Sequence, residues 1–243
     1  MKVLLMALEV VLTPLLWLLK GLLAGVALLP AALLVRWAFG HGLVVGVLSI
    51  GPAYFVFGVA LLAVVVAFKW IVFYRAVAGE WRFFSFHVAC WAVTAQVYDL
   101  ARFFFLPLVR GTWLFNLFLR ALGARIGSNV IVNTSIVCDW DLISIGDDTM
   151  IGDDAVLLAH VGEKGLLRMA PVRIGRRCTI GRDTCVMPGV VIEDGAVLAA
   201  MSVATKNRVL PANTVWGGTE LHQLRASGGR APAVAEEGAS AEE

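Results

Sequence analysis

Charged residues are scarce in this sequence, and acidic residues are nearly absent from its first half. Asp, Glu, Lys and Arg make up 16% of the 243 residues, whereas 59% are hydrophobic. An ordinary soluble domain has about 25% charged residues. Residues 1–125 contain ten basic and three acidic residues, and residues 126–243 contain ten basic and fifteen acidic ones. The composition therefore excludes an ordinary soluble protein, and it predicts a basic membrane half (+7) and an acidic soluble half (−5).

The motifs of several common chemistries are also missing. The four cysteines (Cys90, Cys138, Cys178 and Cys185) show no CxxC or other metal-ligand spacing, so we predict that they pack structurally and form neither disulfides nor a zinc site. There is no Walker loop, no GxSxG elbow and no GxGxxG after a strand. We therefore exclude nucleotide hydrolysis and serine-hydrolase chemistry, and we expect no metal, no permanently bound cofactor and no nucleic-acid partner.

Two long apolar runs predict a transmembrane hairpin over residues 1–69. Gly42 to Phe68 holds 27 residues without a charge, enough to cross about 30 Å of hydrocarbon. Val3 to Phe39 is apolar but is interrupted by charges and prolines, which leaves one kinked span or two short ones; we favour one. A cleaved signal peptide is the competing interpretation. It is disfavoured because a basic n-region of more than one Lys and a small-residue cleavage site are lacking.

Basic residues predict the orientation of this hairpin. Lys2 precedes it, and seven basic residues follow it between Lys69 and Arg125. By the positive-inside rule both ends lie in the cytoplasm, so we expect a protein of the bacterial inner membrane, in contact with lipid, with a cytoplasmic catalytic domain. Aromatic and Arg residues in 70–123 predict either helices in the headgroup region or a helical collar under the next domain. Residues 223–243 are small, polar and acidic, and we predict a disordered tail.

An aliphatic residue returns every six positions in the second half of the chain. The series is Ile174, Ile180, Val186, Ile192 and Leu198, and a second series of small residues is Cys178, Thr184, Val190, Ala196 and Ser202. A period of six fits neither a helix nor a continuous strand. It predicts short strands that turn a corner every six residues, with Gly175, Asp183, Gly189 and Gly195 supplying the corners.

The same phase appears upstream, at Ile126 and Val132 and again at Ile145, Ile151 and Leu157. Stacked units of this kind form a β-solenoid, here of about five turns, over residues 124–222. We expect Ile174, Ile180 and Val186 to line one core, with no helix longer than two turns inside the solenoid. A β-sandwich, the alternative, would show irregular loop lengths.

The repeat is interrupted between Leu157 and Ile174 by an inserted loop that begins with His160. Loops on a rigid scaffold commonly carry function, and an imidazole can take and return a proton near neutral pH. The other three histidines lie in the hairpin, in the aromatic segment and past the last coil. His160 is therefore the candidate general base, against the alternative of a structural histidine.

The stretch PVRIGRRCTIGRDTCVMPGVVIEDGAVLAAMSVATKNRVLPANTVWGG resembles the closing coils of hexapeptide-repeat acyltransferases, whose fold is a left-handed parallel β-helix. The wider stretch, with its LGARIG entry, D-x-D-L-x-x-I-G coil and H-x-x-E-x4-R-M loop, is similar to the membrane-linked C-terminal domains of ε-poly-lysine synthetase and to terminal domains of non-ribosomal peptide synthetases. This resemblance covers about residues 60–222.

The resemblance implies a role for each matching residue. His160 matches the general base of the family, and Asp141 and Glu163 match acidic positions, either of which would orient the imidazole. Lys206 and Trp216 fall where the family binds coenzyme A, although a solvated lysine and a rim aromatic are the simpler readings. The donor is then a coenzyme A thioester or a phosphopantetheinyl carrier protein, and the family implies a homotrimer with active sites between subunits.

Three functions remain open from the sequence. The first is a membrane-anchored acyltransferase that acts alone. The second is a peptide-bond-forming subunit that works with a separate adenylation and carrier protein, because this chain contains neither domain. The third is a non-catalytic trimeric membrane scaffold. The acceptor is not identified by any of these residues.

Overall fold

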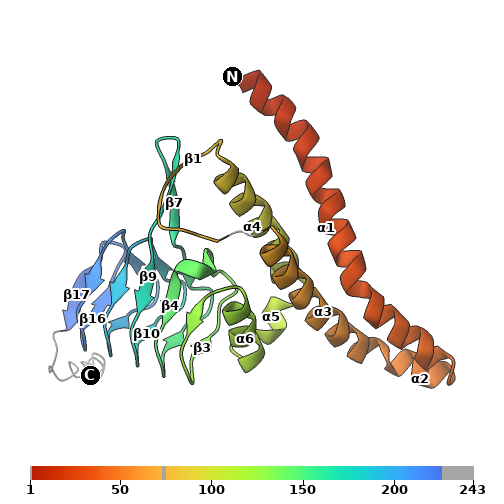
Figure 1. Cartoon of the computed structure of the whole chain (residues 1–243). Helices are drawn as coiled ribbons and strands as arrows, with labels where there is room; N and C mark the ends of the chain where they lie inside the picture. Colours follow the sequence, from red (N-terminus) through yellow and green to blue (C-terminus); the bar gives the residue numbers. More distant parts are fainter. Residues whose placement is uncertain (1, 73–74, 226–243) are drawn as a thin grey trace, which may run out of the picture.

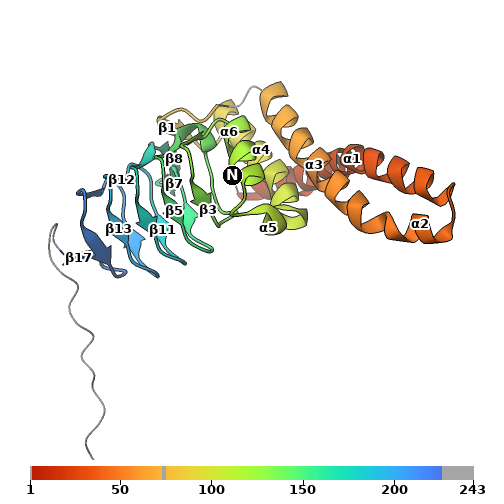
Figure 2. The same cartoon turned by 90° about the horizontal axis from the view of Figure 1, so that it is seen from below.

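The computed structural model describes residues 2–72 and 75–225 as three connected parts (Figure 1). A helical arm of α1, α2 and α3 projects away from a stack of β-coils, and α4, α5 and α6 lie between them. The view from below shows the same order, with coils at one end, α4 to α6 in the middle and the arm at the other end (Figure 2). The tail expected to be disordered lies, from residue 226 on, outside the described residues.

The arm contains two helices long and apolar enough to cross a membrane. Helix α1 (Lys2–Phe39) runs unbroken through Pro14 and Pro30, as expected for one span in place of two. Helix α3 (Ile50–Ile71) runs back beside α1. Over Leu12–Phe39 and Ile50–Ile71 the mean hydropathy is 2.2 and 2.3. By length and composition these are the two candidate spans.

The predicted span over Gly42–Phe68 is divided into two helices near its beginning. A separate helix α2 (Leu43–Leu48) fills the first part, and the single residue Ser49 lies between it and α3. Pro52 has no N–H to donate to the carbonyl of Leu48, so it favours a new helix start at this point. The hydroxyl of Ser49 donates instead to the carbonyl of Gly46, at 2.7 Å.

The middle part is a helical collar that closes one end of the coils. It consists of β1 (Gly79–Arg82), α4 (Phe86–Phe104), α5 (Leu106–Val109) and α6 (Trp113–Ala121). Phe115, Phe118 and Leu119 of α6 are buried in the same core as the first coil. Asn116 donates to the carbonyl of Val130 at 2.6 Å, and Arg120 donates to the carbonyls of the first coil. Polar α6 side chains thereby satisfy carbonyl groups that the end of a solenoid leaves open.

The coils form three parallel sheets. The first contains β2 (Arg125–Ile126), β4 (Ile143–Ile145), β9 (Val172–Ile174), β12 (Val191–Ile192) and β15 (Val209–Leu210). The second contains β3 (Ile131–Val132), β5 (Met150–Ile151), β10 (Thr179–Ile180), β13 (Val197–Leu198), β16 (Val215–Gly217) and the antiparallel β17 (His222–Arg225). The third contains β6 (Val156–Leu157), β11 (Cys185–Val186) and β14 (Val203–Ala204). Together they make a parallel β-helix.

The register confirms the predicted repeat. Ile180 pairs with Leu198 and Ile192 pairs with Leu210, so one turn takes eighteen residues, or three hexapeptides. The aliphatic series is buried in one core, with Ile174, Ile180 and Val186 at most 3% exposed. Within the described coils the helical element is the three-residue 3-10 turn Trp140–Leu142.

Positive φ angles mark the corners of the later coils every six residues. They fall at Arg177, Asp183, Gly189, Gly195, Met201, Asn207 and Asn213. Three of the four corners expected from the sequence are among them. Gly175 is not: a Cβ there would lie 2.4 Å from Oδ1 of Asp194, so this glycine is needed for close packing between coils.

The inserted loop forms a β-hairpin that stands out from the coils (Figure 1). Ile145 pairs with Ile174, 29 residues further on, because β7 (His160–Glu163) and β8 (Leu166–Met169) interrupt this turn. Strand β1 joins β8 antiparallel, a strand that the prediction of interfacial helices for 70–123 missed. Residues 223–225, predicted to be disordered, instead continue β17 along β16, where they cover the exposed sheet edge.

Candidate active site

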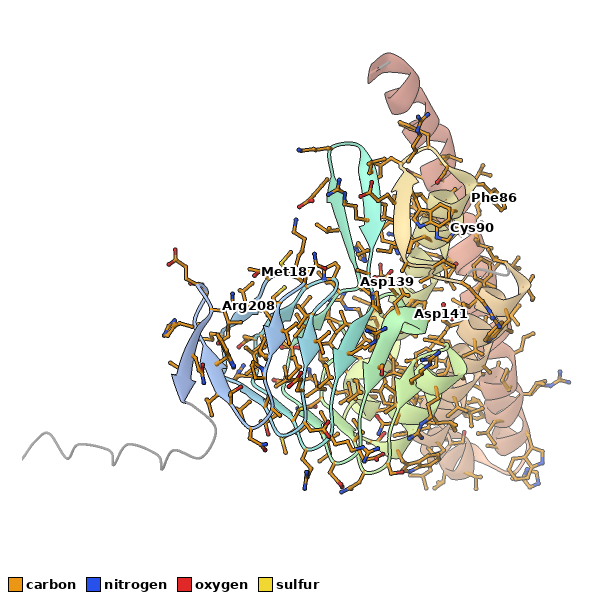
Figure 3. All side chains as sticks on the ribbon, turned by 60° about the vertical axis from the view of Figure 1, so that its left-hand side comes forward. Phe86, Cys90, Asp139, Asp141, Met187 and Arg208 are labelled. Atoms are coloured by element: carbon orange, nitrogen blue, oxygen red, sulfur yellow. The ribbon has the colours of Figure 1, made fainter. Side chains whose placement is uncertain are left out.

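Asp139 is buried where the first coils meet the helical collar (Figure 3). Its φ is +58°, a left-handed conformation that Asp tolerates better than most residues. The 3-10 turn Trp140–Leu142 follows directly, and the Leu142 amide donates to the Asp139 carbonyl at 2.8 Å. This tight turn holds the carboxylate inside the protein, where its side chain is 0% exposed.

The carboxylate of Asp139 holds the imidazole of His160. Nδ1 of His160 lies 2.6 Å from Oδ2, which also accepts the amide of Ala159 at 3.2 Å. Oδ1 accepts the indole N–H of Trp91, from α4, at 2.8 Å. An ionised carboxylate only accepts hydrogen bonds, so this contact assigns the proton of a neutral imidazole to Nδ1. Nε2 is then the basic nitrogen of His160.

The His160 ring lies on the wall of a cavity of about 210 Å³. One wall comes from α4 and the other from the first coils; the lining is Trp91, Ala95, Tyr98, Asp99, Arg102, Ser135, Ile136, Cys138, Asp139, Trp140 and His160. The Trp91 and His160 rings meet edge to face, with centroids 4.7 Å apart. A partly buried base at the wall of a mostly apolar cavity is the arrangement expected for a binding or active site.

The thiol and phenol in this cavity are poor alternatives to His160 as bases. Burial raises the pKa of Cys138 to about 12, and the neighbouring carboxylate of Asp139 adds to this effect. Burial also raises the pKa of Tyr98, whose hydroxyl donates to the carbonyl of Ser135 at 3.0 Å. Both groups therefore stay protonated near neutral pH. Among the described residues, no group of three or more His, Cys, Asp or Glu side chains is arranged to hold a metal ion.

Asp141 and Glu163 are paired with other residues, and it is Asp139 that holds Nδ1 of His160, so a role of Asp141 or Glu163 in orienting or charge-stabilising the imidazole stays a prediction. Asp141 binds Nζ of Lys69, at the end of α3, at 2.9 Å, and it accepts the amide of Ala76 at 3.1 Å. Glu163 lies at the far end of β7, paired with Lys206 and 3.8 Å from Arg168. The hydrogen bond from Lys206 holds the pKa of Glu163 below its usual value, which disfavours proton acceptance.

Lys206 and Trp216, the residues matched to coenzyme A binding, lie apart from each other. Lys206 borders a second cavity, of about 300 Å³, between the hairpin and the corners of the later coils. Val161 lines this cavity and His160 the first one, because neighbouring residues of strand β7 point to opposite faces. Trp216 is half-buried under the guanidinium of Arg208, with the cation 5.0 Å from its ring centroid. Their binding roles stay predictions.

Two residues of the site were missed from the sequence. Asp139 belongs to the same D-x-D-L motif as Asp141, and the motif alone does not say which carboxylate turns inward. Trp91 is one of several Trp residues in an aromatic segment, with nothing local to distinguish it. The left-handed backbone at Asp139 turns its carboxylate inward. The packing of α4 against the coils brings Trp91 to that carboxylate.

Comparison with known proteins places these observations in a family. A family model described as the hexapeptide repeat of succinyl-transferase matches residues 171–203. The putative colanic acid biosynthesis acetyltransferase WcaF of Escherichia coli is 32% identical over 161 residues, which cover 56% of this chain and 84% of WcaF. This chain belongs to the hexapeptide-repeat acyltransferases. The hexapeptide-repeat coils and the enzyme class expected from the sequence are thereby confirmed at the level of the family, and insertion of the arm into a membrane stays a prediction.

Two further relatives of this hexapeptide-repeat acyltransferase differ in how much they share. The delta-poly-L-ornithine synthetase of Acinetobacter baumannii is 25% identical over 217 residues, 83% of this chain but only 16% of the synthetase. A solved hexapeptide-repeat acetyltransferase of Vibrio cholerae is 26% identical, with a TM-score of 0.40, over 44% of this chain and 64% of that one. The chain thus spans only a small part of the synthetase.

Proposed function

We propose that this protein transfers an acyl group from a coenzyme A thioester to a hydroxyl or amine, with His160 as the general base. The observation that supports the proposal is the geometry at His160: Asp139 holds Nδ1 at 2.6 Å, and the ring lies on the wall of a cavity. A base oriented by a third group is the usual arrangement for activating a nucleophile. Membership of an acyltransferase family points to the same chemistry.

The reaction needs one proton to be moved. Nε2 of His160 takes the proton of the acceptor as its oxygen or nitrogen attacks the thioester carbonyl. The tetrahedral intermediate then breaks its carbon–sulfur bond, and the thiolate leaves with the proton returned by His160. Asp139 stabilises the imidazolium in between. Backbone amides at the coil corners are the candidate donors to the oxyanion.

The donor is expected on the other face of β7. The second cavity there is bordered by Lys206 and Arg168, whose charges suit the phosphates of coenzyme A, although Glu163 and Glu80 neutralise part of this charge. The thioester end of the donor would then pass the open edge of β7 to meet the acceptor at His160, on the face where the ring lies. The trimer typical of the family is part of this proposal, with the arm of each subunit anchored in the membrane.

A second candidate is supported by the poly-ornithine synthetase, which is similar over 83% of this chain. In that case the donor is an aminoacyl group on a separate carrier protein, and the acceptor is an amine. Both candidate functions use His160 as the base. They differ in whether the thioester donor is coenzyme A or a carrier protein. Purified protein incubated with acetyl coenzyme A, or with an aminoacyl-loaded carrier protein, separates them by the mass of the product.

His160→Asn tests the catalytic role. The variant should keep the fold and lower kcat by at least about a hundredfold, since a positioned base contributes about 10²–10⁴-fold. Donor consumption is measured by release of free thiol with the full chain in nanodiscs. His222→Asn is the matched control, because His222 lies on β17, past the last coil. Parental turnover by His160→Asn would mean that another group is the base and that the assignment of His160 is wrong.

Labelling in intact cells tests the proposed membrane topology. With both ends of the arm in the cytoplasm, Lys2→Cys should stay unlabelled by an impermeant maleimide until the cells are opened. Arg36→Cys, near the turn between α1 and α2, should be labelled from outside if the arm crosses the membrane. Labelling of Lys2→Cys from outside would contradict the hairpin.

A further inference from the structure

One face of α4 lines the cavity at His160 for most of the length of the helix. The lining residues recur at helical spacing: Trp91, Ala95, Tyr98, Asp99 and Arg102. At 1.5 Å per residue this stripe is about 16 Å long. Ser135, Ile136, Cys138 and Trp140 form the opposite wall. The cavity is therefore a groove between α4 and the first coils.

The groove has an inner end and an outer end. The side chains of Asp99 and Arg102 are 46% and 43% exposed, whereas His160 is 20% exposed and Asp139 is fully buried. The outer end is therefore at Arg102. A molecule that enters there passes Tyr98 and Ala95 before it reaches His160.

The outer end lies beside the middle of α3. Phe105, directly after α4, packs closely on Gly58 of α3. A Cβ added at Gly58 would lie 2.1 Å from the ring of Phe105. The inner end lies near the end of α3, where Lys69 binds Asp141 of the 3-10 turn. Gly58 precedes Lys69 by eleven residues, or about 16 Å of helix. The groove thus opens toward the free part of the arm, and His160 lies on the side away from it.

The surface around this opening is aromatic and apolar. Four rings near Gly58 are exposed by 40% or more: Tyr54, Phe55, Phe103 and Phe104. Beyond them the arm exposes Leu43, Val44, Leu48 and Ile50. Aromatic rings gather where a membrane protein meets the headgroup layer. These rings indicate that the headgroup layer lies level with Gly58, so that the later half of α3, which is buried against the collar and the coils, lies outside the lipid. Arg102 lies at this layer, next to Phe103.

We propose that the groove binds the acceptor, and that the acceptor is a membrane lipid with a polyhydroxylated head group. Its chain stays in the bilayer beside Phe103, and its head group enters past Asp99 and Arg102 until one hydroxyl reaches Nε2 of His160. Asp99 and Arg102 are only loosely paired, at 3.8 Å, so one can accept from hydroxyls and the other can donate to them. Trp91 and Tyr98 offer aromatic walls to the apolar face of a sugar ring.

This inference rests on the proposed function for its chemical step. The acyl carbon forms a bond to the hydroxyl oxygen of the lipid, the carbon–sulfur bond breaks, and the proton passes through His160 to the thiolate. Binding in the groove does not itself depend on that step, so the two ideas are separable by experiment.

Photo-crosslinking in nanodiscs tests the groove with the full chain. Three probes carry the same diazirine on the head group: octadecyl glucoside, soluble methyl glucoside and octadecyl phosphocholine. Cross-linked peptides are located by mass spectrometry. We expect octadecyl glucoside to label residues 91–102 and 135–140 at least tenfold more than either other probe. Asp99→Ala with Arg102→Ala should lower this yield at least fivefold, whereas Arg176→Ala, on an exposed coil corner, should not change it.

Each contrary outcome overturns a stated part of the inference. Equal labelling by methyl glucoside would mean a soluble acceptor, equal labelling by octadecyl phosphocholine would remove the requirement for hydroxyls, and lipid labels confined to other segments would mean no acceptor groove. The same experiment on His160→Asn needs no turnover. If the parent protein labels in the groove but transfers no acyl group, the groove stands and the proposed function fails.

Discussion

The coils and the helices of this protein are held together in different ways. In residues 125–217 the packing of the aliphatic series recurs one turn later, as the pairs Ile180 with Leu198 and Ile192 with Leu210 show. The helices that the structure describes have no such repeat, and the arm meets the coils through interactions such as Lys69 with Asp141. A repeat tolerates the loss of one unit better than a unique contact does, because neighbouring coils supply similar interactions.

The candidate site lies where these two kinds of structure meet. Asp139 and His160 belong to the coils, at an irregular first turn and at the inserted hairpin. Trp91, which also holds the carboxylate of Asp139, belongs to α4. The repeat supplies a rigid frame, and the residues of the candidate site come from departures from the repeat and from the collar.

Lys69→Met should have the largest effect on this comparison, because it removes a buried cation that joins α3 to the coils. Lys69 is fully buried and also donates to the carbonyl of Leu122 at 2.6 Å. Breaking a buried pair from one side costs about 3–5 kcal/mol. We expect the free energy of unfolding, measured by urea titration in detergent micelles, to fall by about that amount. Lys69→Met with Asp141→Leu should recover most of it. Parental stability of Lys69→Met would mean that arm and coils are independent units.

Asp139→Asn tests whether the corner at Asp139 differs from the other corners. The amide keeps the shape but loses the charge, so the imidazolium formed in the transition state loses its partner. We expect kcat to fall about 10–100-fold, as is typical when a charge-assisted hydrogen bond worth about 1.5–3 kcal/mol is lost. Asp183→Asn, at a corner with φ of +52°, is the control and should retain parental kcat. Equal effects of the two substitutions would leave Asp139 with a purely architectural role.

Trp91→Phe measures how much the collar contributes to holding Asp139. It keeps an aromatic ring beside His160 but removes the N–H that binds Asp139. We expect kcat to fall up to about tenfold, with an unchanged KM for acetyl coenzyme A, because about 1.4 kcal/mol of orientation is lost. Trp70→Phe removes a similar indole bond, to the carbonyl of Ala121, and should leave kcat unchanged. A raised KM for the donor would place Trp91 in donor binding instead.

The solenoid and the arm were predictable because both are encoded by nearby residues. A strand of the coil needs an aliphatic residue, a small residue and a corner within six positions, and α1 and α3 need only continuous apolar composition. His160 was found for a related reason, since it opens the segment in which the six-residue series is interrupted. The break between α2 and α3 at Ser49 and the strand β1 each depend on a few residues and follow no repeating pattern. Both were missed.

The partners of His160 could not be read from the sequence. Asp139 and Asp141 are separated by one residue, and only the left-handed corner at Asp139 and the 3-10 turn after it send one carboxylate to His160 and the other to Lys69. Trp91 and Asp139 are 48 positions apart, and Lys69 and Asp141 are 72 apart. Periodicity records steric rules that act between neighbours along the chain, whereas these contacts arise only when unrelated segments pack against each other. The sequence by itself therefore determined the frame and the position of the candidate base His160, and the tertiary structure decided which residues hold its imidazole.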